Sequence, residues 1–326
     1  MANVFRKKFR HIDKILEDSR SATAHGGQLI IDALAKEFGL WKRLAACEQI
    51  DPRRDKSRGF SPEAIVAQLV FSLCSGGVSL SDAGRLGEDR ALGELLGMER
   101  WAEETTIGEW LRGQNEAGLR ALWEIIREFA DWATKRARPS RVRRDGQVEV
   151  FFDDTQVEGE GHYFEGVGVN YEGRRSYSWQ TLWVGPFVAD AQWGPGNREA
   201  SECLGSALEA SASLWEDAAR EGQARFYADS ASSAGKYLNL LDQHGWDWTV
   251  SYNKWTEPLD RLAEKMGEDQ WGEEREGVGR NGKPILEQFG WIKHVPGGEC
   301  KRVQTFAVVR YKAKDGGDLF WRYAYV

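Results

Sequence analysis

The sequence is poor in the residues and motifs on which several common enzyme classes depend. None of its four cysteines belongs to a Cys-x-x-Cys pair, and none of its five histidines has the His-x-x-x-His spacing of metal ligands. A zinc site or a disulfide framework is therefore not expected. The chain also lacks a P-loop and a Gly-x-Ser-x-Gly motif. Nucleotide-dependent and serine-hydrolase chemistry therefore have no support.

Long apolar runs are absent as well. No stretch approaches the roughly 20 apolar residues that cross a bilayer. The basic N-terminus, MANVFRKKFRHIDK, has no following apolar stretch and no small-residue cleavage site, so it does not predict a secretory signal. These absences, with the few cysteines, predict a protein of a reducing cytoplasm that does not associate with membranes.

The residues that are present predict a globular chain with a substantial core. The 326 residues are 41% hydrophobic and include 15 tryptophans, and the length suggests about two domains. The net charge of −7 argues mildly against a nucleic-acid partner. The charge is uneven, however, because residues 1–150 carry 25 Lys and Arg against 23 Asp and Glu. Local basic clusters matter more than the total, since phosphate contacts are short-range in salt.

The first part of the chain, 1–145, has helical patterns. Apolar residues recur at helical spacing over 30–40 and 119–134. Ser61 and Pro62 are typical of a helix start, and Gly76-Gly77 of its end. Thr106 to Glu109 has the spacing of a capping box that would open another helix. The basic stretch 135–144 contains Pro139 and predicts a connector that could also contact DNA.

The second part has the pattern of an α/β core. Strands are expected over 148–152, 224–228 and 246–252, paired strands over 178–189, and helices over 199–221 and 235–244. Residues 255–303 are polar and Gly-rich with weak periodicity, whereas 305–312 and 319–326 predict a hairpin around Asp315-Gly316-Gly317. We therefore expect a core domain over 146–254 and a β-rich region over 255–326.

Carboxylates follow two of these strands directly. Asp153 and Asp154 come after VEVFF, and Asp229 comes after ARFYA. Carboxylates at strand ends of an open α/β sheet lie where ligands bind, and two of them could hold a hard divalent cation. An Asp after a strand is also a common turn former or helix cap. The pattern alone leaves both interpretations open.

Several segments, in order, resemble one family of bacterial insertion-sequence proteins, the DDE transposases of group 1. The N-terminal segments are 23–27 (TAHGG), 76–82 (GGVSLSD), 86–92 (LGEDRAL), 95–97 (LLG) and 105–112 (TTIGEWLR). The core segments are 152–155 (FDDT), similar to the family's Asp-x-Thr, 193–197 (WGPGN), similar to its Pro-Gly-Asn turn, and 227–230 (YADS), similar to its Arg-x-Asp-Ser-Gly. Tyr227 and Ala231 depart from that last pattern.

The resemblance implies an RNase H-like catalytic core behind an all-helical N-terminal domain, with a β-rich insertion at the C-terminal end. Asp153 and Asp229 would be catalytic residues and ligands of Mg²⁺ or Mn²⁺, and they would serve cleavage and strand transfer at the element's ends. Adjacent strand residues point to opposite faces, so only one of Asp153 and Asp154 can face the metals. Asp153 fits Asp-x-Thr, and Asp154 stays as the alternative.

The family's third carboxylate is a Glu on a later helix, in a Tyr-Arg-Glu-Lys setting. Five glutamates remain as substitutes, Glu273, Glu274, Glu276, Glu287 and Glu299, and none has that setting. Glu287 is the best of them, because 284–287 (PILE) could open a helical turn. We therefore expect a truncated transposase, or a fragment of a longer reading frame, whose sheet has an apolar face that lacks its last helix.

The expected partner is DNA, at the terminal inverted repeats of a mobile element, bound by a homodimer in the bacterial cytoplasm at the nucleoid. The helices around 61–73 and 105–112 are candidates for DNA contact, with phosphate contacts from basic side chains at Arg53, Arg54, Lys56, Arg58, Arg112, Arg141, Arg143 and Arg144. Two alternatives remain: a catalytically dead remnant that only binds DNA, and a general metal-dependent nuclease on the same fold.

Overall fold

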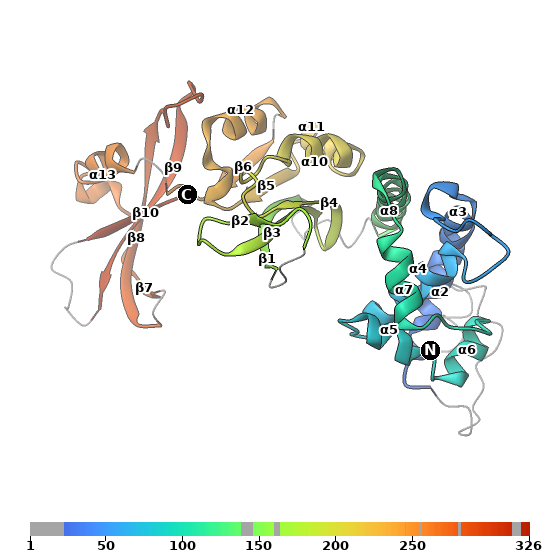
Figure 1. Cartoon of the computed structure of the whole chain (residues 1–326). Helices are drawn as coiled ribbons and strands as arrows, with labels where there is room; N and C mark the ends of the chain where they lie inside the picture. The colour runs from blue at the N-terminus through green and yellow to red at the C-terminus, as the bar shows by residue number, and fades with distance from the viewer. Residues whose placement is uncertain are drawn as a thin grey trace. The chain divides into compact units, whose positions relative to one another are not determined.

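The computed structural model describes residues 23–137, 146–159, 164–244, 246–253, 256–279, 282–314 and 321–326. The chain forms two compact units, Met1–Trp132 and Ala133–Val326, whose elements are labelled in Figure 1. The division into three domains expected from the sequence stays a prediction. Arg141, Arg143, Arg144 and the 315–317 turn lie outside the described residues.

The described part of the first unit is helical, as expected. Its elements are α2 (Gln28–Phe38), α3 (Leu40–Ala46), η2 (Glu48–Ile50), α4 (Pro62–Cys74), α5 (Leu80–Leu86), α6 (Arg90–Leu96), α7 (Glu104–Arg112) and α8 (Glu116–Arg136). No helix among the described residues is both long and apolar enough to span a lipid bilayer.

The helix boundaries confirm one predicted helix start and correct another, although the Ser61 side chain makes no capping hydrogen bond. Helix α4 begins at Pro62 after Ser61 and is followed by Gly76 at φ 87°, a left-handed conformation that glycine adopts without strain. The capping box expected at Thr106 is wrong, because α7 already begins at Glu104. The box forms instead at α5, where Ser79 and Asp82 bond each other's backbone N–H groups.

A buried glutamine joins three parts of the helical unit. Gln68 of α4 is 1% exposed, and its Nε2 donates to the carbonyls of Ala83 and Ala102 at 2.8 Å each. Its Oε1 accepts from the Ala102 N–H, also at 2.8 Å. Both ends of the Gln68 amide are thereby paired, as a buried amide requires. The side chain thus ties α4 to α5 and to the segment that enters α7.

The second unit is built on a mixed sheet. Its strands are β1 (Val148–Glu158), β2 (Gly168–Val169), β3 (Arg175–Val184), β4 (Phe187–Pro195), β5 (Ala224–Ala228) and β6 (Asp247–Val250). Their order is β2-β3-β1-β5-β6, and β4 also pairs with β3. Strand β1 is antiparallel to β3 and parallel to β5, and β5 is parallel to β6. This is the RNase H-like arrangement expected from the sequence.

Helices cover one face of this sheet. They are α10 (Leu204–Ser211), α11 (Glu216–Arg220) and α12 (Gly235–Gln243), with the 3-10 turns η3 (Ala212–Leu214) and η4 (Ser230–Ser233). Val150, Phe152 and Phe226 of the strands share one buried cluster with Leu208 and Leu241 of the helices. Figure 1 shows α10, α11 and α12 grouped on the same side of the sheet. The single helix expected over 199–221 is wrong, because it is broken at η3 and does not begin until Leu204.

A second, antiparallel sheet follows. Its strands are β7 (Arg275–Val278), β8 (Pro284–His294), β9 (Gln304–Ala313) and β10 (Arg322–Tyr325), with α13 (Glu257–Ala263) and the turn η5 (Glu268–Gln270) before them. The predicted hairpin of β9 and β10 is confirmed. The helical turn expected at 284–287 is wrong, because these residues open β8, where Glu287 pairs with Arg275 of β7.

One further sequence motif is placed by the structure. The glycines at 277, 279 and 282 have the spacing Gly-x-Gly-x-x-Gly, which occurs in dinucleotide-binding sites. These glycines lie at the end of β7 and in the turn before β8. A dinucleotide site needs this motif between a strand and a helix. The match therefore has no structural support here.

We predict that Gln68→Leu lowers the free energy of unfolding of the full chain by about 3 kcal/mol, because it leaves a buried N–H and two carbonyls without partners. The measurement is urea denaturation followed by circular dichroism. Gln49→Leu, at an exposed position, is the matched control and should change stability by less than about 0.5 kcal/mol. Equal effects of the two substitutions would contradict this role for Gln68.

His244 should make stability depend on pH. It packs edge-on against Trp215 and Trp246, with ring centroids at 5.2 and 5.7 Å, and burial lowers its pKa below the ordinary 6.5. The unfolded chain then binds more protons than the folded chain, so the free energy of unfolding falls as pH drops through about 6.5. We expect His244→Gln to reduce this loss between pH 7.5 and 5.5, whereas the neighbouring Gln243→Asn leaves it unchanged. Identical pH profiles for His244→Gln and the unaltered chain would contradict the assignment.

Candidate active site

Asp153 lies on the face of the sheet that the helices do not cover. Along β1, the side chains of Val148, Val150 and Phe152 are buried, whereas Phe151 and Asp153 are exposed. Strand side chains alternate between faces, so Asp153 points away from α10, α11 and α12. The apolar residues on either side of it determine this orientation.

Asp229 lies beside Asp153. The last paired residues of the parallel strands β1 and β5 are Phe152 and Ala228, and the preceding pair, Phe151 and Tyr227, stacks with ring centroids at 5.2 Å. Asp153 and Asp229 each follow the last pair by one residue. Asp229 keeps an extended backbone, with φ −78° and ψ −177°. The two carboxylates therefore occupy neighbouring positions on the same face.

Each carboxylate is oriented by one local hydrogen bond. Asp153 Oδ2 accepts from the Thr155 hydroxyl at 3.1 Å, and Asp229 Oδ1 accepts from the Ala231 N–H at 2.9 Å as the cap of η4. Both side chains are exposed. A carboxylate oxygen has lone pairs beyond one such bond, so both groups retain capacity to bind a cation.

The surrounding face is aromatic. Phe151, Trp179, Trp183 and Trp193 are between 36% and 52% exposed. Their registers put them on the same face as Asp153, since Phe151 pairs with Trp183, and Trp179 with Trp193. The two carboxylates therefore lie on a face that carries large rings together with polar side chains such as Thr155, Glu149 and Arg225.

Asp154 points to the opposite face. Its Oδ1 accepts from the Ser178 hydroxyl at 2.8 Å, and its Oδ2 accepts from Gln180 Nε2 at 3.0 Å. Ser178 and Gln180 are at most 1% exposed. The structure thus brings Asp153, and not Asp154, beside Asp229.

The donor set fits a hard cation in part. Carboxylate oxygens suit Mg²⁺, which usually keeps several waters and takes only one or two carboxylates from a protein. Within the described ranges, no three His, Cys, Asp or Glu side chains gather as a metal site. Of the glutamates considered from the sequence, Glu276 binds Lys314 and Glu287 lies opposite Arg275, both in the second sheet. Neither joins the aspartate pair.

The basic residues of 53–58 differ in their surroundings. The Arg53 guanidinium donates to Asp51 at 2.8 and 2.9 Å and to the carbonyl of Arg58 at 2.9 Å, and this bonding lowers the pKa of Asp51. Arg53 therefore organises its own loop. Arg54, Lys56 and Arg58 are exposed, and Arg58 also pairs with Asp55 at 3.2 Å. Arg112 is exposed in the last turn of α7.

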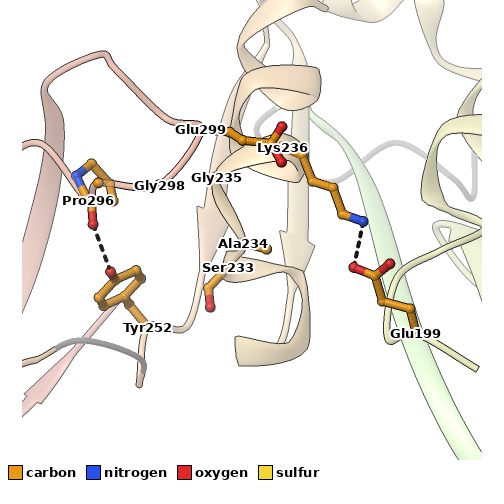
Figure 2. Close-up of a pocket in the computed structure, with 10 residues that line it drawn as sticks. Glu199, Ser233, Ala234, Gly235, Lys236, Tyr252, Pro296, Gly298 and Glu299 are labelled. Atoms are coloured by element: carbon orange, nitrogen blue, oxygen red, sulfur yellow. Dashed lines mark hydrogen bonds and ion pairs between the residues drawn. The ribbon is translucent and has the colours of Figure 1, made fainter. Parts of the chain in front are cut away.

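A cavity of about 400 Å³ lies between the start of α12 and residues 296–299 (Figure 2). Lys236 forms an ion pair of 2.5 Å with Glu199 on one side, and the Tyr252 hydroxyl makes a long bond of 3.5 Å to the Pro296 carbonyl on the other. The ion pair raises the pKa of Lys236. Asp153 and Asp229 do not line this cavity.

Sequence reasoning did not find Ser178 and Gln180. A signal was present, because 175–184 (RSYSWQTLWV) alternates small or polar residues with large ones. Alternation of this kind predicts a strand with two different faces. It could not show that the polar face is the buried one, because that depends on where the helices pack.

Comparison with known proteins identifies the family of the chain. Residues 8–314 match the family described as transposase DDE domain group 1. No curated protein matches the chain. A solved structure similar to it is the piggyBac transposase synaptic complex with hairpin DNA, at 11% identity and a TM-score of 0.41, covering 91% of this chain and 60% of that one. Because the family match spans nearly all of its residues, this chain belongs to the DDE group 1 transposase family.

Proposed function

We propose that this chain is a DNA transposase that cleaves the ends of an insertion sequence and transfers the freed strand, with Mg²⁺ or Mn²⁺ as cofactor. The observation that carries the proposal is that Asp153 and Asp229 each come one residue after the last paired residues of the parallel strands β1 and β5, and that both are exposed. Membership of the family supports the same conclusion.

The residues of the chain would act as follows. Asp153 and Asp229 hold the cation through their carboxylate oxygens, and their extended backbones and local hydrogen bonds limit how far the two groups can move. A bound divalent cation supplies Lewis-acid stabilisation of charge at the phosphorus that is attacked.

The proposed partner is DNA at the terminal inverted repeats of the element, bound by two copies of the chain at the bacterial nucleoid. The exposed Arg54, Lys56, Arg58 and Arg112 of the helical unit support phosphate contact. Arg53 is not proposed as a direct DNA contact, because its guanidinium already donates hydrogen bonds to the Asp51 carboxylate and the Arg58 carbonyl.

We expect Asp153→Asn and Asp229→Asn each to reduce Mn²⁺ affinity at least tenfold, because each removes one of two anionic ligands. The measurement is isothermal titration calorimetry on the full chain, followed by cleavage of an oligonucleotide that carries an element end. Asp217→Asn, an exposed carboxylate of α11, is the matched control. Unchanged Mn²⁺ affinity in both variants would exclude this site. If the unaltered chain binds the metal and the end DNA but does not cleave that DNA, the catalytically dead alternative is favoured.

Reversal of charge at Arg54 and Lys56 together should weaken DNA binding. Each lost phosphate contact reduces the salt slope of the binding constant by about 0.9, so a change of about 2 is expected for Arg54→Glu/Lys56→Glu. Fluorescence anisotropy at several salt concentrations measures it. Arg261→Glu, an exposed cation of α13, is the control. If the double variant keeps the original slope, the 53–58 loop does not bind DNA.

A further inference from the structure

The carboxylate next to the candidate metal ligand has a separate set of partners. Asp154 lies on the helix-covered face, where Ser178 and Gln180 of β3 donate to its two oxygens at 2.8 and 3.0 Å. Both donors are almost completely buried. A partly buried carboxylate that accepts charge-assisted hydrogen bonds on both oxygens is held more firmly than an exposed one.

Gln180 extends these contacts beyond the two strands. Its Nε2 also donates to the Glu199 carbonyl at 3.0 Å, and its Oε1 accepts from the Cys203 N–H at 2.9 Å. It therefore ties β3 to the segment that enters α10. The side chain of Glu199 in turn pairs with Lys236 of α12, as Figure 2 shows. Helix α12 directly follows Asp229 and η4, so the network connects the surroundings of both candidate ligands.

The part of β1 that carries Asp153 needs such support. Strand β5 pairs with β1 only as far as Phe152. From Asp153 to Glu158, the described ladder partner of β1 is β3 alone. A strand segment paired on one side opens more easily than one paired on both sides. The bonds of Asp154 fasten this segment to β3 one residue beyond Asp153.

We propose that Asp154 and Gln180 are positioning residues, which hold the end of β1 against β3 so that Asp153 stays beside Asp229, and that Asp154 is not itself a metal ligand. This inference rests on the proposed function of Asp153 and Asp229. It assigns the second Asp of the FDDT segment a role on the opposite face from the metal.

Asp154→Asn tests the inference at nearly constant shape. The new amide can still accept from Gln180 if its N–H₂ turns to the Ser178 hydroxyl, but it no longer carries the charge that strengthens both bonds. We expect Mn²⁺ affinity, measured by calorimetry on the full chain, to fall about three- to tenfold. Amide hydrogen exchange of 153–156, measured without metal, should quicken about tenfold.

The double variant Asp154→Asn/Gln180→Glu is the rescue experiment. The carboxylate introduced at position 180 would accept from both the amide introduced at position 154 and the Cys203 N–H, which restores two of the bonds although it loses the one to Glu199. We expect the double variant to regain at least half of the Mn²⁺ affinity and of the exchange protection that Asp154→Asn loses. Gln180→Glu alone places two carboxylates together and should weaken both. Gln223→Glu, at an exposed position before β5, controls for the added charge.

The outcomes separate the roles. No change in affinity or exchange for Asp154→Asn overturns the positioning role. Loss of Mn²⁺ binding as complete as in Asp153→Asn, without rescue by Gln180→Glu, makes Asp154 a ligand. Unchanged binding in Asp153→Asn and Asp229→Asn instead refutes the proposed function itself. If Asp154→Asn does not fold, Ser178→Ala removes a single hydroxyl donor and is expected to have a smaller effect of the same sign.

Discussion

Adjacent side chains of a strand point to opposite faces, and the chemistry of this protein depends on that alternation in β1. Val148, Val150 and Phe152 must face the helices, because only that face offers an apolar cluster in which they can be buried. Asp153 is thereby directed to the open face, and Asp154 to the covered one. A slip of one residue in register would exchange the two carboxylates and expose Phe152. The hydrophobic core therefore selects which Asp is available to a cation.

The second requirement is the parallel pairing of β1 with β5. Parallel partners lie level with each other, so the residues after Phe152 and Ala228 become neighbours although 76 positions separate Asp153 from Asp229 in the sequence. The stacked rings of Phe151 and Tyr227 fill the space next to them. Tyr227 departs from the family's usual Arg. Its ring contributes a packing contact on the site's own face, where an Arg would bring charge instead.

Polar groups on the covered face carry a cost that this fold offsets with a connected network. Buried hydrogen-bonding groups destabilise a protein when they are left unpaired. Ser178, Gln180 and Asp154 satisfy one another and the backbone at Glu199 and Cys203. In the helical unit, Gln68 solves the same problem with three bonds. Each network also joins segments that are distant in sequence. A network of this kind can therefore fix the relative positions of the elements that it connects.

The sequence alone determined the helical character of the first unit and the strands of the core, and it made Asp153, Asp154 and Asp229 candidates, because these follow from local periodicity and from short segments shared with a family. It could not determine the β8 strand at 284–294, whose weak periodicity becomes a strand only through pairing with β7 and β9. It left the choice between Asp153 and Asp154 open, and it did not reveal Ser178 or Gln180. Those outcomes depend on which face of the sheet the helices cover, and only long-range packing of segments far apart in the chain decides that.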